Sequence, residues 1–221
     1  MIKRTIVTLF SVCTMISYIL HELKNISNYQ DNILFFIIFV LPYVLMNILS
    51  CSYLITSMLK KPKDMNDNIW MVIASFIGCN LTLVTGHFIE LKSADPNISI
   101  AFVGIVLSIA AIPFYIAAVI NLGKNLTVLP EANTLNTKGI YSISRHPLYS
   151  CYIYWYFTNI LIYQSKAIII TSIMQAIFQI IRAINEEKIL EKNFPEYGDY
   201  KKRVWWIGKI KEKQLKAEYQ E

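Results

Sequence analysis

Long apolar runs constrain the fold of this chain more than any other feature. They cover residues 5–20, 33–59, 69–91 and 98–120, and a final pair at 148–163 and 167–181. In a bilayer every backbone N–H and C=O group needs a partner within the protein, and continuous rather than alternating hydrophobicity favours helices over a barrel. About 20 residues suffice for one helix to cross the hydrocarbon. The sequence therefore predicts an all-α, polytopic membrane protein with about six transmembrane helices.

The basic residues predict how these helices are oriented. The chain has 221 residues, of which 16% are charged, and its formal net charge is +6. If the N-terminus is cytoplasmic, that side of the membrane carries Lys3, Arg4, Lys60, Lys61, Lys63, Lys124, Lys138, Arg145 and every Lys and Arg from Arg182 onward. The opposite side carries only Lys24, Lys92 and Lys166. The positive-inside rule then places both termini in the cytoplasm and the chain in the cell membrane. Because topology explains the positive charge, we expect the lipid bilayer and no nucleic acid as a partner.

Two stripes of polar side chains run along the final pair of helices. One stripe consists of Gln175, Gln179, Arg182 and Glu186, and the other of Tyr149, Tyr152, Tyr156, Asn159 and Tyr163. Steps of three and four residues place each stripe on one helical face. Polar groups at membrane depth are expensive, so these short helices are expected to form a hairpin that walls a cavity. Two simpler interpretations stay open: the stripes join helices by hydrogen bonds, and Arg182 with Glu186 forms a surface ion pair.

The connection before this hairpin ends in a candidate anion site. Pro147 suits the first turn of a helix, where its missing N–H has no partner to lose. The free N–H groups of such a turn attract anions, and Arg145 and His146 come directly before it. The alternative is a basic cluster that only sets the membrane topology.

We expect no metal site. His87 and Glu90 are three residues apart but lack an evident third ligand, and the four cysteines are scattered singly along apolar helices. Trp205 and Trp206 suit an aromatic anchor at the lipid headgroups. The expected organisation is four N-terminal transmembrane helices (1–120), a core with a cytoplasmic linker and the hairpin (121–206), and a basic, solvated tail (207–221).

Five motifs in this core follow one another in an order known from one group of enzymes. They occupy residues 122–127, 137–141, 145–149, 182–187 and 196–204. In this order they resemble the isoprenylcysteine carboxyl methyltransferases and their bacterial relatives. Phospholipid methyltransferases share the Arg-His-Pro and Glu-Glu elements.

The resemblance implies that S-adenosylmethionine is the methyl donor and that the C-terminal helical hairpin forms its site. The residues that it implies for cofactor binding are Asn133, Thr134, Leu135, Asn136, Tyr141, His146, Pro147, Leu148, Tyr149 and Glu186. Arg182 would bind the carboxylate of the acceptor, and the anion site at Arg145 would suit the carboxylate of the cofactor. Arg182, Glu186 and His146 are thus the expected catalytic residues.

The chemistry predicted from these residues is in-line displacement of the methyl group. The acceptor is expected to be a lipophilic small molecule or a lipidated substrate, similar to an isoprenylcysteine. An ionised carboxylate needs no base, whereas a thiol, phenol or amine would need one, for which His146 and Glu187 are candidates. Two alternatives remain, an NADPH-dependent reductase similar to sterol reductases and a non-catalytic scaffold or transporter.

Overall fold

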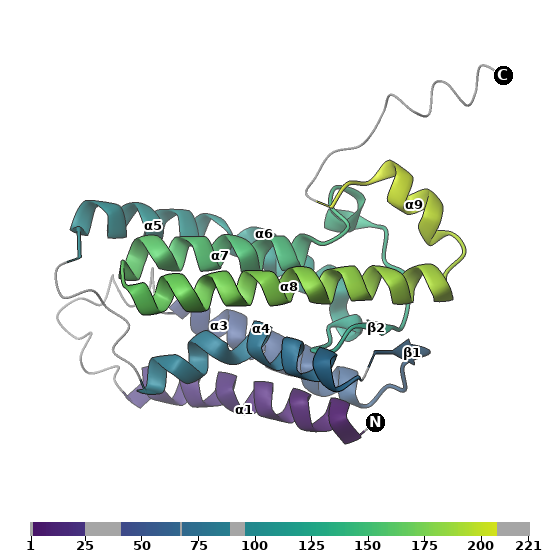
Figure 1. Ribbon diagram of the computed structural model, residues 1–221, viewed down its shortest axis with the longest axis horizontal. Helices are drawn as coiled ribbons and strands as arrows, with labels where there is room; N and C mark the ends of the chain where they lie inside the picture. The colour runs from purple at the N-terminus through teal and green to yellow at the C-terminus, as the bar shows by residue number, and fades with distance from the viewer. Residues whose placement is uncertain (1, 25–40, 67, 89–95, 207–221) are drawn as a thin grey trace, which may run out of the picture.

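The computed structural model describes residues 2–24, 41–66, 68–88 and 96–206, and its described part is a helical bundle (Figure 1). The helices are α1 (Ile2–Lys24), α3 (Leu41–Met58), α4 (Ile69–Phe88), α5 (Ile98–Ala110), α6 (Ile112–Leu122), α7 (Pro147–Tyr163), α8 (Lys166–Asn193) and α9 (Tyr197–Arg203). Two short 3-10 helices, η3 (Gly123–Asn125) and η4 (Gly139–Ser142), and two strands, β1 (Asp64–Met65) and β2 (Glu131–Ala132), belong to the connections. The predicted all-α class is confirmed.

Within the described residues, three stretches are long and apolar enough to cross a membrane. They are Ile2–Leu20, Ile98–Leu122 and Lys166–Asn193. Val44–Met58 and Ile69–Leu81 are shorter apolar helices. The chain is thus a membrane protein, while the total of six spans stays a prediction. Residues 33–40 and 89–91 of the predicted spans lie outside the described part of the chain, as does the tail at 207–221.

The fourth predicted span is broken near its middle. Helix α5 ends at Ala110 and α6 begins at Ile112, with Pro113 in its first turn. A proline inside an apolar run disrupts the hydrogen bonding of a continuous helix, so the sequence predicts a kink at Pro113, and the break confirms it. Pro42 lies inside the second apolar run and predicts a kink there as well. That prediction stays untested, because Pro42 lies at the start of α3, after the segment 25–40, which is not described.

Helices α7 and α8 form the predicted hairpin. Gln164 ends α7 in the left-handed conformation, with φ of 51°, and the side chain of Ser165 caps α8 by accepting a bond from the N–H of Ile168. The prediction that both helices are short is wrong for α8, which has 28 residues and is about 42 Å long. Hydropathy alone suggested an end near residue 181. The charged turns beyond it pack on protein instead, since Lys192 and Asn193 both donate to Asp64 of β1.

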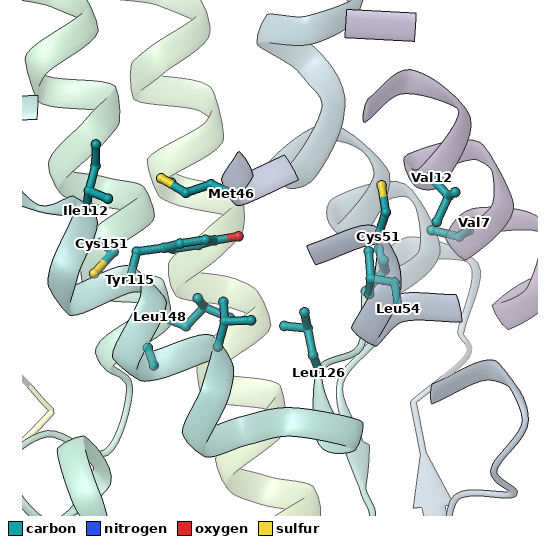
Figure 2. Close-up of a cluster of buried hydrophobic side chains, with 13 residues drawn as sticks. Val7, Val12, Met46, Cys51, Leu54, Ile112, Tyr115, Leu126, Leu148 and Cys151 are labelled. Atoms are coloured by element: carbon teal, nitrogen blue, oxygen red, sulfur yellow. The ribbon is translucent and has the colours of Figure 1, made fainter. Parts of the chain in front are cut away.

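A small antiparallel sheet, which the sequence did not predict, holds the linker against this end of the bundle. Asp64 pairs with Ala132 and Met65 with Glu131. The sheet, α9 and the N-terminal end of α1 lie at the same end of the bundle (Figure 1). The core between α1, α3, α6 and α7 is apolar, with Met46, Leu54, Tyr115 and Leu148 among its buried side chains (Figure 2).

Candidate active site

The polar stripes of the hairpin, except Tyr163 at the end of α7, face one cavity of about 240 Å³. Its wall includes Gln175, Gln179, Arg182 and Glu186 from α8, and Tyr149, Tyr152, Tyr156 and Asn159 from α7. The expectation that these faces enclose a cavity is therefore confirmed. This volume is somewhat smaller than the usual range for small-molecule sites, roughly 300–1,000 Å³.

The opposite wall comes from helices for which the sequence indicated no role. These helices contribute Ser11 and Met15 of α1, Met46, Asn47, Ser50 and Leu54 of α3, Cys79 of α4 and Tyr115 of α6. Periodicity within one helix shows which of its side chains share a face, but not which distant helix lies opposite. The N-terminal helices thus contribute the more apolar side of the cavity.

Arg182 is a buried cation whose hydrogen-bond partners are neutral. It is 3% exposed. Its guanidinium donates to the carbonyl of Val128 at 2.6 Å, to the Sγ of Cys79 at 3.2 Å and to the side chain of Gln179. Its Nε is buried and has no hydrogen-bond partner in the part of the chain that the structure describes. Among the described residues no carboxylate lies within ion-pair distance of it, so its charge is available to an anionic ligand.

Glu186 lies one helical turn from Arg182 but bonds to a tyrosine. The hydroxyl of Tyr149 donates to Oε2 of Glu186 at 2.7 Å, and the ring centroid of Tyr149 lies 5.2 Å from Cζ of Arg182. The interpretation of Arg182 and Glu186 as a simple surface pair is therefore wrong. In the described ranges Glu186 is bonded to this neutral hydroxyl and to no cation, and such a carboxylate suits a cationic ligand.

Glu187, the next residue, has a different environment. Its Oε1 accepts from Nη2 of Arg145 at 2.8 Å and lies 3.0 Å from Nε2 of His146, and its Oε2 is 3.1 Å from Nζ of Lys201. Arg145 also donates to the backbone carbonyls of Lys201 and Val204. Arg145 lines the cavity. Its guanidinium also holds the C-terminal segment, and the sequence did not indicate this second role.

The segment after α9 closes over this network. The N–H of Arg145 donates to the carbonyl of Trp205 at 3.0 Å, and the hydroxyl of Ser144 donates to the carbonyl of Trp206. The indole of Trp206 meets the buried ring of His146 edge-on, with centroids 5.6 Å apart. Trp206 thus contributes to the surroundings of His146, and Trp205 is half-exposed.

A second charged pair, Arg4 with Glu131, lies beside the cavity. Both side chains are buried, at 4% and 0% exposed. Arg4 also donates to the carbonyls of Ser57 at 3.0 Å and Lys60 at 2.9 Å, so it joins α1, α3 and β2. Burial raises the pKa of Glu131 above the usual range, although the guanidinium of Arg4 opposes that shift. From the sequence Arg4 was expected only as one of the cytoplasmic charges.

The other predicted cofactor residues divide into two groups. Tyr141, Leu148 and His146 line the cavity, and burial raises the pKa of the Tyr141 phenol well above its usual 10. The linker lines the cavity with earlier residues than predicted, namely Asn125, Leu126, Thr127, Val128 and Glu131. The cavity wall does not include the predicted residues Asn133, Thr134, Leu135 and Asn136. Pro147 faces an apolar groove on the other side of α7. Glu90 lies outside the described residues, and so does the side chain of His87.

Comparison with known proteins supports the resemblance that the motifs indicated. The family model of phospholipid methyltransferases matches residues 99–197, which include α7, all of α8 and the linker before them. This part of the chain is similar to the phospholipid methyltransferase family. The match favours methyl transfer over NADPH-dependent reduction. The chain is also 31% identical over 142 residues to the nickel-cobalt-cadmium resistance protein NccN of Alcaligenes xylosoxydans xylosoxydans. That alignment covers 62% of this chain and 61% of the relative.

Proposed function

We propose that this protein is a membrane methyltransferase that transfers a methyl group from S-adenosylmethionine to the carboxylate of a lipophilic acceptor. The observation that carries the proposal is the pair of uncancelled charges in one cavity. Arg182 is buried among neutral partners, and Glu186 bonds to a neutral phenol. A cavity built this way suits an anion on one side and a cation on the other.

The residues present fit the cofactor. S-adenosylmethionine supplies an electrophilic methyl group on a sulfonium, which becomes a neutral thioether after transfer. Glu186 would bind its positive charge, and the aromatic faces of Tyr141 and Tyr149 would lie beside it. The backbone N–H groups of Leu148 and Tyr149 in the first turn of α7 would suit its carboxylate.

Arg182 would hold the acceptor carboxylate and orient one oxygen towards the methyl group. That oxygen forms the new O–CH₃ bond as the C–S bond breaks, and the electron pair of the C–S bond goes to sulfur. A negative and a positive charge neutralise each other in this step, so a largely water-free site favours it. An ionised carboxylate requires no proton transfer. This agrees with Glu187, whose carboxylate is already bonded to Arg145, His146 and Lys201.

A lipophilic acceptor suits the apolar side of the cavity. Met15, Met46, Leu54 and Trp155 line it beyond the charged residues. We propose that the end of the bundle with α9 and the sheet faces the cytoplasm, because the positive-inside rule assigns the side with more Lys and Arg residues to the cytoplasm. The name of the relative NccN points to metal ions. In the described ranges no cluster of three or more His, Cys, Asp or Glu side chains is placed to hold a metal, so we propose no metal site.

The chemistry of the product tests this proposal. Protein in lipid vesicles is incubated with methyl-labelled S-adenosylmethionine and an S-farnesylcysteine carboxylate. A methyl ester releases labelled methanol in mild base, whereas a methylated thiol, phenol or amine does not. We expect base-labile label. Label that resists base would contradict the carboxylate acceptor, and no transfer to any lipophilic acceptor would contradict the function.

Variants of α8 connect the product to the site. Arg182→Gln is expected to lower kcat/KM for the acceptor at least 100-fold while the affinity for S-adenosylmethionine changes less than threefold. Lys188→Gln, which removes an exposed charge from the same helix, is the matched control. Equal losses of acceptor turnover in both variants would refute the role of Arg182.

A further inference from the structure

Tyr149 lies against both Arg182 and Glu186. Residues four apart on a helix are neighbours on its surface, and oppositely charged side chains there usually attract each other. Here the ring of Tyr149 lies against the Arg182 guanidinium, with 5.2 Å between the ring centroid and Cζ, while its hydroxyl donates to Glu186 at 2.7 Å. Tyr149 thus contacts both charges from the neighbouring helix α7.

We propose that Tyr149 is a positioning residue that keeps these two charges apart, so that Arg182 stays available to an anion and Glu186 to a cation. The inference deepens the proposed function and rests on it for the identity of the two ligands. The separation itself is a property of the three side chains.

The chemistry of a tyrosine suits this role. Its π face attracts the guanidinium, and its hydroxyl gives the carboxylate a hydrogen bond without neutralising its charge. In a buried cavity two unit charges attract each other much more strongly than in water. A direct pair between Arg182 and Glu186 would therefore have to be broken before either side chain could bind a ligand. Tyr149 stabilises both charges while leaving both uncancelled.

Tyr149 is itself held in place. It is 8% exposed, and the ring of His146 meets it edge-on with 5.6 Å between centroids. Arg182 is held from its other side by Val128 and Cys79. The separation is thus built into the packing of α7 against α8 and the linker before β2.

A double-mutant cycle between Arg182 and Glu186 tests the separation without any ligand. Arg182→Gln, Glu186→Gln and the double variant are made in the wild type and again together with Tyr149→Leu. The melting temperature of each is measured in the same mild detergent. In the wild type we expect the melting-temperature changes of the two single variants to sum, within 1 °C, to the change of the double variant. Together with Tyr149→Leu we expect a favourable coupling of at least 3 °C, because the pair can then form. Equal coupling in the two backgrounds would overturn the inference.

Binding of S-adenosylmethionine gives a second readout, and it still applies if Tyr149→Leu does not fold. Tyr149→Phe keeps the ring and removes the hydroxyl, so we expect its Kd for the cofactor to rise three- to tenfold. Tyr154→Phe is the matched control, because the Tyr154 hydroxyl donates to the carbonyl of Leu107 on the other side of α7. An unchanged Kd in Tyr149→Phe would count against the inference. A wild type that binds no S-adenosylmethionine while the cycle behaves as expected would contradict the proposed function alone.

Discussion

Replacement of Arg4 by Met is expected to destabilise the protein in a pH-dependent way. The change leaves Glu131 buried without its cation and removes the guanidinium hydrogen bonds to the carbonyls of Ser57 and Lys60. Removing one partner of a buried ion pair typically costs about 3–5 kcal/mol. For a chain of this size that corresponds to a decrease of roughly 6–20 °C in Tm.

The part of this loss that comes from the Glu131 charge has an upper bound, because the carboxyl group can take up a proton instead. Relative to an ordinary pKa of 4.5, protonation costs about 3.4 kcal/mol at pH 7 and about 1.4 kcal/mol at pH 5.5. A pKa that is higher in the folded state means that the folded protein binds the proton more tightly. Stability then falls as the pH rises above 4.5 through the folded pKa and returns on acidification. Arg4→Met should therefore recover up to about 2 kcal/mol between pH 7 and pH 5.5, or roughly 4–8 °C.

Thermal unfolding in one detergent at both pH values measures this recovery. The double variant Arg4→Met/Glu131→Gln is the control, since it lacks the titrating carboxyl and should not share the recovery. An equal Tm deficit of Arg4→Met at pH 7 and pH 5.5 would refute the reasoning. So would the same recovery in the double variant.

Three further changes test the packing and the C-terminal segment. A Cβ on Gly104 would lie 2.8 Å from Cβ of Leu161, so Gly104→Leu should push α5 away from α7 and lower Tm by at least 5 °C. The control is Gly78→Ala, which should change Tm by less than 2 °C because the nearest atom to its new Cβ would be 3.5 Å away. Gly139 has a φ of 61°, so Gly139→Ala should lower the free energy of unfolding by about 1–2 kcal/mol in a denaturant titration. Glu187→Gln removes the carboxylate that binds three basic side chains, so trypsin should cleave after residues 201–203 at least fivefold faster than in the wild type; equal cleavage rates would show that this carboxylate does not hold the segment.

The sequence predicted those parts of the site that depend on spacing within one helix. Gln179, Arg182 and Glu186 face the cavity because steps of three and four residues fix a helical face wherever the helix packs. The break at Pro113 was also predictable, because it depends on the proline itself and not on distant residues. The end of α8 was predicted too early, because hydropathy reports contact with lipid and the final turns of α8 contact protein instead.

The sequence could not predict partners that are distant in the chain. Arg4 is 127 residues from Glu131, and nothing around either residue indicates the other. Arg145 resembled an anion ligand, yet it binds a carboxylate of α8 and carbonyls near α9. Local sequence shows which chemical groups are present, whereas the tertiary fold decides which of them are already paired and which are left for a ligand.

Equilibrium binding of S-adenosylmethionine to the purified protein and its Glu186→Gln variant tests whether the cavity binds this cofactor through Glu186. We expect one bound cofactor per chain, a Kd at least tenfold higher in the variant, and a melting temperature that stays within 2 °C. We also expect S-adenosylhomocysteine, which lacks the sulfonium charge, to lose less affinity than S-adenosylmethionine on this substitution. A folded Glu186→Gln variant that binds the cofactor as tightly as the wild type would contradict the role of Glu186, and a wild type that does not bind the cofactor would contradict the proposed function.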